Sequence, residues 1–125
     1  MGRGYRVAVP ATTTVSFTGT LNTDTLSLRL VRSLRATYSG WHLVSNPYPA
    51  PLNWDKVLPA DRVGLDAAIY VYESTGPGTG YFRSYVNGVG TGDSLIAAGQ
   101  AFFVHVSGTT PGGSTGRLRF RNSQR

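Results

Sequence analysis

GWHLVSNPYPAPLNW, residues 40–54, is the stretch that decides the fold of this chain. Its first part alternates apolar and polar residues as a short strand does, and its second part holds three prolines within five residues. Because proline fixes φ and has no N–H to donate to a sheet ladder, we predict that residues 46–51 form one stiff, non-helical corner. Trp41 and Trp54 lie on either side of it. We expect a trans bond between Tyr48 and Pro49, since trans is the commoner isomer even before proline.

The rest of the chain indicates one all-β domain, residues 1–125. A length of 125 residues is that of one ordinary domain, and 16 glycines and 7 prolines would separate many short strands. Alternation of apolar and polar residues predicts strands at 5–9, 13–17, 26–31, 41–44, 67–72, 81–86, 95–99, 100–106 and 117–121. Eight or nine short strands at this spacing predict an antiparallel β-sandwich or jelly roll, with a barrel as the alternative.

Three local features refine this prediction. Asn53 is a good N-cap residue and Pro59 ends the following turn, so one short helical turn is expected here and no other helix. Residues 73–80 are rich in turn-forming residues, which predicts a long glycine-rich loop inside a hairpin. In the most apolar strand, 100–106, alternation assigns Phe102, Val104 and Val106 to the core.

Basic residues dominate the charge. The formal net charge is +6, and since Lys56 is the single lysine among 12 basic residues, the other 11 are arginines. Such a charge attracts anionic partners. However, codon bias in a GC-rich genome produces the same excess of arginine over lysine. We predict no nucleic-acid partner. Arg117, Arg119 and Arg121 alternate with apolar residues in the last strand. They could meet an anion, but we interpret them as the solvent face of an edge strand, where charge discourages aggregation.

The sequence also excludes several classes of site. It has no cysteine, so disulfides, thiol catalysis and cysteine-ligated metals are excluded. It has no apolar stretch of about 20 residues that would cross a bilayer, so no membrane insertion is expected. The first residues lack the apolar region of an export signal. The chain is therefore either cytoplasmic or a module cut from a longer exported protein.

No catalytic motif is present. The two histidines, His42 and His105, lie in neither a G-x-S-x-G nor an H-E-x-x-H pattern. His42 with Ser45 or Asp55 is the best candidate for part of a triad, yet an exposed or hydrogen-bonded imidazole is the commoner role. All six acidic residues fall in expected loops or turns. We predict a protein that is not an enzyme, with no catalytic residue, no metal site and no cofactor.

Aromatic residues supply the candidate binding site. If residues 67–72 and 81–86 form a hairpin, its polar face is expected to carry tyrosines around one arginine, with the two tryptophans nearby. Exposed aromatic rings with polar tips suit the apolar faces of sugars or the planes of bases and peptides. The alternative is that a second layer covers this face and makes the tyrosines core residues. The candidate ligand-binding residues are Tyr70, Tyr72, Tyr81, Arg83, Tyr85, Trp41 and Trp54.

The chain resembles a β-rich module of large secreted and surface proteins of Bacteroidetes, found upstream of a type IX secretion sorting domain. The resemblance covers nearly the whole chain, and its most specific part is the GWHLVSNPYP segment, residues 40–49, followed by Trp54. Ser45 departs from the pattern, where glycine is expected. The other matching segments are residues 4–7, 68–72, 96–103 and 120–125.

This resemblance implies an extracellular or cell-surface setting in which the module lies beside other domains of the same secreted chain. The family brings no assigned activity and no catalytic residues. We therefore expect a non-catalytic structural or interaction module. The alternative is a carbohydrate-binding module that uses the tyrosine-rich hairpin, with a polysaccharide as its partner.

Overall fold

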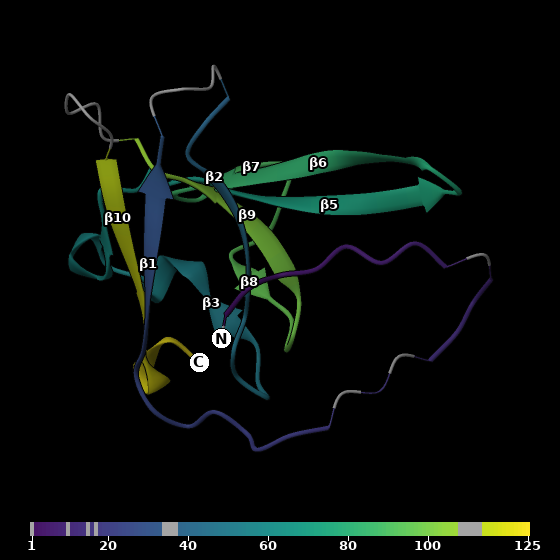
Figure 1. The fold of residues 1–125 in the computed structure, drawn as a ribbon, viewed down its shortest axis with the longest axis horizontal. Helices are drawn as coiled ribbons and strands as arrows, with labels where there is room; N and C mark the ends of the chain where they lie inside the picture. The colour runs from purple at the N-terminus through teal and green to yellow at the C-terminus, as the bar shows by residue number, and fades with distance from the viewer. Residues whose placement is uncertain (1, 10, 15, 17, 34–37, 108–113) are drawn as a thin grey trace.

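The computed structural model describes every residue except 1, 10, 15, 17, 34–37 and 108–113 (Figure 1). Within the described part the chain is all-β, with ten strands and three short 3₁₀ turns. The strands are β1 (Leu26–Arg32), β2 (Trp41–Ser45), β3 (Leu52–Asn53), β4 (Arg62–Val63), β5 (Ile69–Gly76), β6 (Thr79–Val86), β7 (Val89–Gly90), β8 (Leu95–Ile96), β9 (Ala101–His105) and β10 (Ser114–Phe120). The turns are η1 (Trp54–Lys56), η2 (Pro59–Asp61) and η3 (Asn122–Gln124).

The strands form antiparallel sheets that pack as a sandwich, as the alternation pattern predicts. A five-stranded sheet has the order β2-β9-β5-β6-β7, and a three-stranded sheet has the order β1-β10-β4. A third, two-stranded sheet pairs β3 with β8. Figure 1 shows the β5–β6 hairpin extending away from the rest of the molecule. None of the described helices is long and apolar enough to span a membrane.

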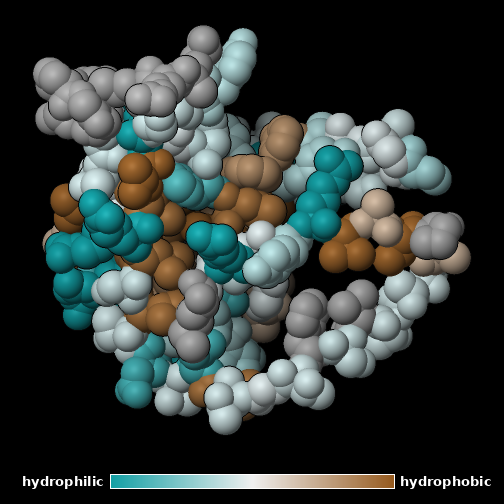
Figure 2. All heavy atoms as spheres, viewed as in Figure 1, coloured by the Kyte–Doolittle hydropathy of each residue, from teal (hydrophilic) through white to brown (hydrophobic). Residues whose placement is uncertain are grey.

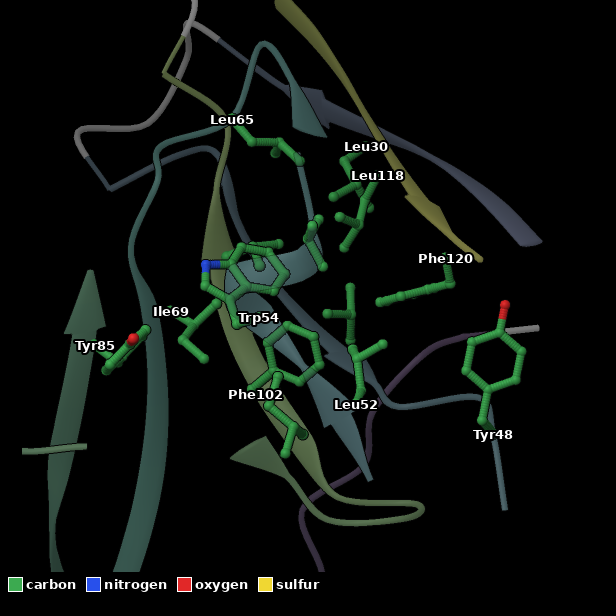
Figure 3. Packing of buried hydrophobic residues seen from close by; sticks show 14 of the residues in the cluster. Leu30, Tyr48, Leu52, Trp54, Leu65, Ile69, Tyr85, Phe102, Leu118 and Phe120 are labelled. Carbon is green, nitrogen blue, oxygen red and sulfur yellow. The ribbon is translucent and has the colours of Figure 1, made fainter. Parts of the chain in front are cut away.

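The core lies where the inner faces of these sheets meet (Figure 3). The ring centroids of Phe102 in β9 and Phe120 in β10 are 6.5 Å apart in an edge-on arrangement, so they join the two larger sheets. The prediction that Phe102, Val104 and Val106 face the core is confirmed, because all three are completely buried. Other fully buried side chains are Val44, Leu52, Val57, Ile69, Ile96 and Leu118.

Residues 46–51 form the predicted corner, in neither strand nor helix, and Asn46 holds it in place. The buried Asn46 side chain accepts a hydrogen bond from the backbone N–H of Tyr48 at 3.0 Å. Its amide nitrogen donates to the carbonyl oxygens of Ala50, Ile96 and Ala97. One side chain thus ties the corner to the end of β8. The described backbone has no cis peptide bond, so the Tyr48–Pro49 bond is trans, as expected.

The strand predicted nearest the N-terminus is not formed. Residues 5–9 are in no sheet, and Tyr5 is 80% exposed. Nearer the N-terminus, Arg3 makes an isolated bridge to Val44. The alternation was misleading because residues 5–9 have no sheet partner and bury neither set of side chains. In the predicted strand 13–17, positions 15 and 17 lie outside the described residues, and the remaining positions are exposed and not in a strand.

The hairpin and the helical turns also differ from the prediction. The expected long loop at 73–80 is wrong, because β5 and β6 continue to a two-residue turn at Pro77 and Gly78. Gly78 has φ of +70°, which glycine adopts without strain, and Thr75 forms a bulge between the paired Ser74 and Gly76. The turn after Asn53 is confirmed, with the Asn53 side chain accepting from the N–H of Asp55, but η2 and η3 were not predicted.

Candidate ligand-binding face

The register of β5 and β6 divides the predicted tyrosine cluster between two faces of the sheet. Residues directly opposite each other in an antiparallel pair lie on the same face. Tyr72 is opposite Phe82, whereas Arg83 is opposite Val71. Tyr70 and Tyr72 therefore share the outer face with Phe82, and Tyr81, Arg83 and Tyr85 lie on the other face. The prediction of four tyrosines around one arginine is wrong. Tyr72 is opposite Phe82, and the side chain of Phe82 points to the opposite side of β6 from that of Arg83.

Two of the predicted ligand-binding residues belong to the core. Trp54 is 3% exposed, and its indole N–H donates to the carbonyl oxygen of Ala67 at 2.8 Å. Tyr85 is 9% exposed, and its hydroxyl donates to the carboxylate of Asp55 at 2.7 Å. This hydrogen bond to Asp55, with a further effect of burial, raises the pKa of Tyr85 above its usual value. Neither ring can stack on a ligand.

Tyr81 and Arg83 lie on the other face of the hairpin, away from Tyr70 and Tyr72. Arg83 donates to the carbonyl oxygen of Thr91 at 2.7 Å and forms an ion pair with Glu73 at 3.2 Å. Glu73 is directly opposite Tyr81 in the hairpin. Arg83 thus connects the hairpin to the loop before β8, while Tyr81 is exposed beside it.

The outer surface of the five-stranded sheet carries an aromatic face, defined here as Trp41, Tyr70, Tyr72, Phe82 and Phe103. Trp41 of β2 contacts Tyr70 of β5 edge-on, with ring centroids 5.2 Å apart. Phe82 of β6 makes similar contacts with Tyr72 at 5.3 Å and with Phe103 of β9 at 5.6 Å. The period of two in all four strands aligns these side chains on one side. Trp41 is 43% and Phe82 is 56% exposed, so the face is open to a ligand.

A hollow of about 400 Å³ lies on this face and is lined only by aromatic residues, Trp41, Tyr70, Phe82 and Phe103. A second hollow, of about 260 Å³, shares Phe82 and Phe103 with the first. The two hollows together extend from Trp41 toward Tyr72, so they make one shallow apolar groove across the sheet.

A histidine and a carboxylate lie at the Trp41 end of this groove. His105 of β9 is directly opposite Trp41, with ring centroids 4.7 Å apart, and its Nδ1 is 2.7 Å from a carboxylate oxygen of Asp66. The backbone N–H of Asp66 also donates to the carbonyl oxygen of His105. The pair joins residues 39 positions apart, and no sequence motif announced it.

The N-terminal segment lies over the other end of the groove. Gly4 donates to the carbonyl oxygen of Leu43 at 3.0 Å, and Ser45 donates to that of Gly2, so the segment joins the free edge of β2. The guanidinium of Arg6 then lies 5.0 Å above the Tyr72 ring. Figure 1 shows the segment, in purple, continuing beside β5. A chain segment thus already occupies part of the outer face.

The catalytic candidates are not brought together. The His42 ring contacts the carbonyl oxygen of Val31, whereas Asp55 accepts the hydroxyl of Tyr85, so each has a different partner. Among the described residues, His105 is the one histidine within hydrogen-bonding distance of an aspartate, Asp66, and its ring also contacts Trp41. The described residues hold no group of three or more His, Cys, Asp or Glu side chains arranged to bind a metal ion.

Comparison of the chain with protein-family models, with curated proteins and with solved structures finds no match to any of them.

Proposed function

We propose that this chain is a non-catalytic interaction module whose aromatic face binds neutral polysaccharide. The observation that carries the proposal is the groove lined by Trp41, Tyr70, Phe82 and Phe103, two of which are about half exposed. The apolar faces of sugar rings pack on aromatic side chains, and a flat sheet surface suits an extended polymer.

Polar groups at the edge of the groove support a carbohydrate rather than a purely apolar ligand. Asp66 and His105 lie beside Trp41 and offer a carboxylate and an imidazole to sugar hydroxyl groups. Because Asp66 would repel an anionic sugar, the proposal favours neutral polymers. The resemblance of residues 40–49 supports an extracellular or cell-surface setting, where such polymers occur.

Titration calorimetry with a panel of soluble neutral polysaccharides tests this proposal. Trp41→Ala and Phe82→Ala should each weaken binding at least about tenfold, which corresponds to about 1.4 kcal/mol. Tyr81→Ala is the matched control, because Tyr81 is equally exposed on the opposite face of the hairpin and should leave affinity unchanged. Absence of saturable binding by the wild type, or unchanged affinity in Trp41→Ala, would overturn the proposal.

The N-terminal segment favours a second function, in which the aromatic face packs against a neighbouring domain of the same secreted chain. The segment from Gly2 to Gly4 already hydrogen-bonds to the edge of β2, and the side chain of Arg6 lies over Tyr72. A longer chain that includes the adjacent domain tests this function. Protection of Trp41 from a soluble fluorescence quencher in the longer chain, but not in residues 1–125, would support the structural role.

A further inference from the structure

The outer face of the three-stranded sheet carries arginines that the fold does not explain. Arg29 of β1 and Arg117 of β10 are directly opposite each other, so they share a face. Arg119 lies on the same face two residues along, about 7 Å from Arg117. Like charges directly opposite in a sheet repel each other and destabilise the pairing. These three residues are called the arginine strip below.

Protection of an exposed sheet edge does not account for the arginine strip. The sequence led us to place Arg117 and Arg119 on the solvent face of an edge strand; Arg117 is indeed exposed, but the strand is not an edge strand. β10 is the central strand of its sheet, with β1 on one side and β4 on the other at Arg117. A central strand needs no charge to block further pairing. Arg121, the third arginine of the pattern, lies beyond the strand and forms an ion pair with Asp61 at 2.8 Å.

No acidic residue neutralises the strip from within its own sheet. The segments β1, β4 and β10 contain neither Asp nor Glu. Four of the six acids have side-chain partners elsewhere: Asp55 with Tyr85, Asp61 with Arg121, Asp66 with His105, and Glu73 with Arg83. Asp93 caps the N–H of Leu95. Asp24 lies beside Tyr48, whose hydroxyl donates to the backbone carbonyl oxygen of Asp24 at 2.9 Å.

The Arg119 side chain adds a second unfavourable feature to the same surface. Its Nε atom is buried and has no hydrogen-bond partner within the part of the chain that the structure describes. Burying an unpaired N–H costs free energy, as does the repulsion between Arg29 and Arg117. Figure 2 shows strongly hydrophilic side chains beside hydrophobic ones over the region of β1 and β10. An unpaired buried N–H and a pair of like charges both lower stability, and proteins keep such unfavourable features mainly at functional sites.

We propose that the arginine strip binds an acidic polysaccharide, at a site separate from the aromatic face. Guanidinium groups bind sulfate and carboxylate oxygens through paired hydrogen bonds, and an anion placed between Arg29 and Arg117 relieves their repulsion. The remaining residues on this face are Ser27, Val31, Val63 and Thr115. None is aromatic, so the bases of a single-stranded nucleic acid have nothing to stack on here. The surface therefore favours a sugar polymer over a nucleic acid.

Dextran sulfate is the probe, and unsulfated dextran is its uncharged control. The double variant Arg29→Gln/Arg117→Gln should lower affinity for dextran sulfate at least tenfold and make its salt dependence less steep. The double variant Lys56→Gln/Arg83→Gln removes the same net charge from elsewhere on the surface and should lose less than threefold. Equal losses in the two variants would mean that net charge alone attracts the polymer, and they would overturn the proposal.

Two further measurements separate the remaining explanations. Arg29→Gln/Arg117→Gln should unfold at the same temperature as the wild type or higher, because it removes a repulsive pair. A marked fall in that temperature would make the arginines structural and overturn the proposal, as would tighter binding of oligo(dT) than of dextran sulfate. Trp41→Ala should bind dextran sulfate with wild-type affinity, so failure of the aromatic face as a neutral-sugar site leaves this result unaffected.

Discussion

At the scale of single residues, Tyr85 shows how one hydroxyl links two elements of the fold, β6 and η1. Its ring packs in the core from β6, and its hydroxyl donates to Asp55 in η1, the turn that follows the proline corner. The carboxylate stabilises the protonated hydroxyl, so the pKa of Tyr85 is raised. Burial likewise raises the pKa of Tyr48, the central aromatic residue of the corner.

These raised pKa values predict that the protein loses stability in alkali. An unfolded tyrosine ionises near pH 10, whereas the folded Tyr85 stays protonated to higher pH. The stabilisation is therefore complete below about pH 10 and is lost as pH rises through the folded pKa. Urea unfolding between pH 8 and about 11 should show a falling free energy of unfolding, with a shallower fall in Tyr85→Phe. Tyr48→Phe/Tyr85→Phe should be shallower still, and an unchanged slope in Tyr85→Phe would contradict the explanation.

At the scale of elements, the β5–β6 hairpin depends on one glycine inside a strand. A Cβ built on Gly80 would collide with the carbonyl oxygen of Glu73 and with the ring of Tyr72. A Cβ on Gly78, in the turn, would meet no atom within 4 Å. The hairpin therefore packs tightly at Gly80, where Tyr72 of the aromatic face crosses over it.

Gly80→Ala should consequently disrupt the hairpin, while Gly78→Ala should not. The Gly78 variant is expected to cost about 1 kcal/mol, the strain of a side chain at φ of +70°. The Gly80 variant should cost more than about 2 kcal/mol, because the backbone of β5 must move. Amide hydrogen exchange of β5 and β6 measures the difference. Equal protection of both strands in the two variants would show that the contact with Glu73 is not important.

The elements that the sequence predicted are those whose alternating pattern has a partner strand. Phe102 and Val104 were assigned to the core correctly because β9 is flanked by β2 and β5. Residues 5–9 have an equally clear pattern but no partner, and alternation does not tell whether one exists. The tyrosine cluster failed for a related reason: alternation gives two faces to each strand, but only the register between strands decides which faces coincide.

At the scale of the whole molecule, aromatic rings lie against both surfaces of the five-stranded sheet and have opposite roles there. Phe120 is completely buried against Phe102 between the sheets, whereas Phe82 projects outward from β6. Phe120→Ala should cost about 3 to 5 kcal/mol, since it opens a cavity in the core. Phe82→Ala should cost about 1 kcal/mol, the value of its ring contacts. Thermal unfolding of both variants checks this contrast, and comparable losses would mean that the aromatic face is part of the core.

The candidate site was only partly predictable at this scale. Tyr70 and Tyr72 were chosen because alternation placed them on the polar face of the expected hairpin. Trp41 was chosen because it was expected to lie near that face. Phe82 was not among the candidate residues, because nothing in the sequence joined it to Tyr70. The pairing of His105 with Asp66 depends on an isolated bridge between Leu65 and Val106, which no local pattern reveals.

The pairing of β1 with β10 also bears on the order in which the sheets form during folding. Leu26 lies opposite Phe120, so this ladder joins segments 94 positions apart, from 26 to 120. During synthesis, β1 can pair with β10 only after all the residues between them have been made. Contacts between such distant segments form slowly, because the long loop must close before any bond compensates for the lost entropy. We therefore expect the sheet that carries the arginine strip to form later than the β5–β6 hairpin, whose two strands are adjacent in the chain.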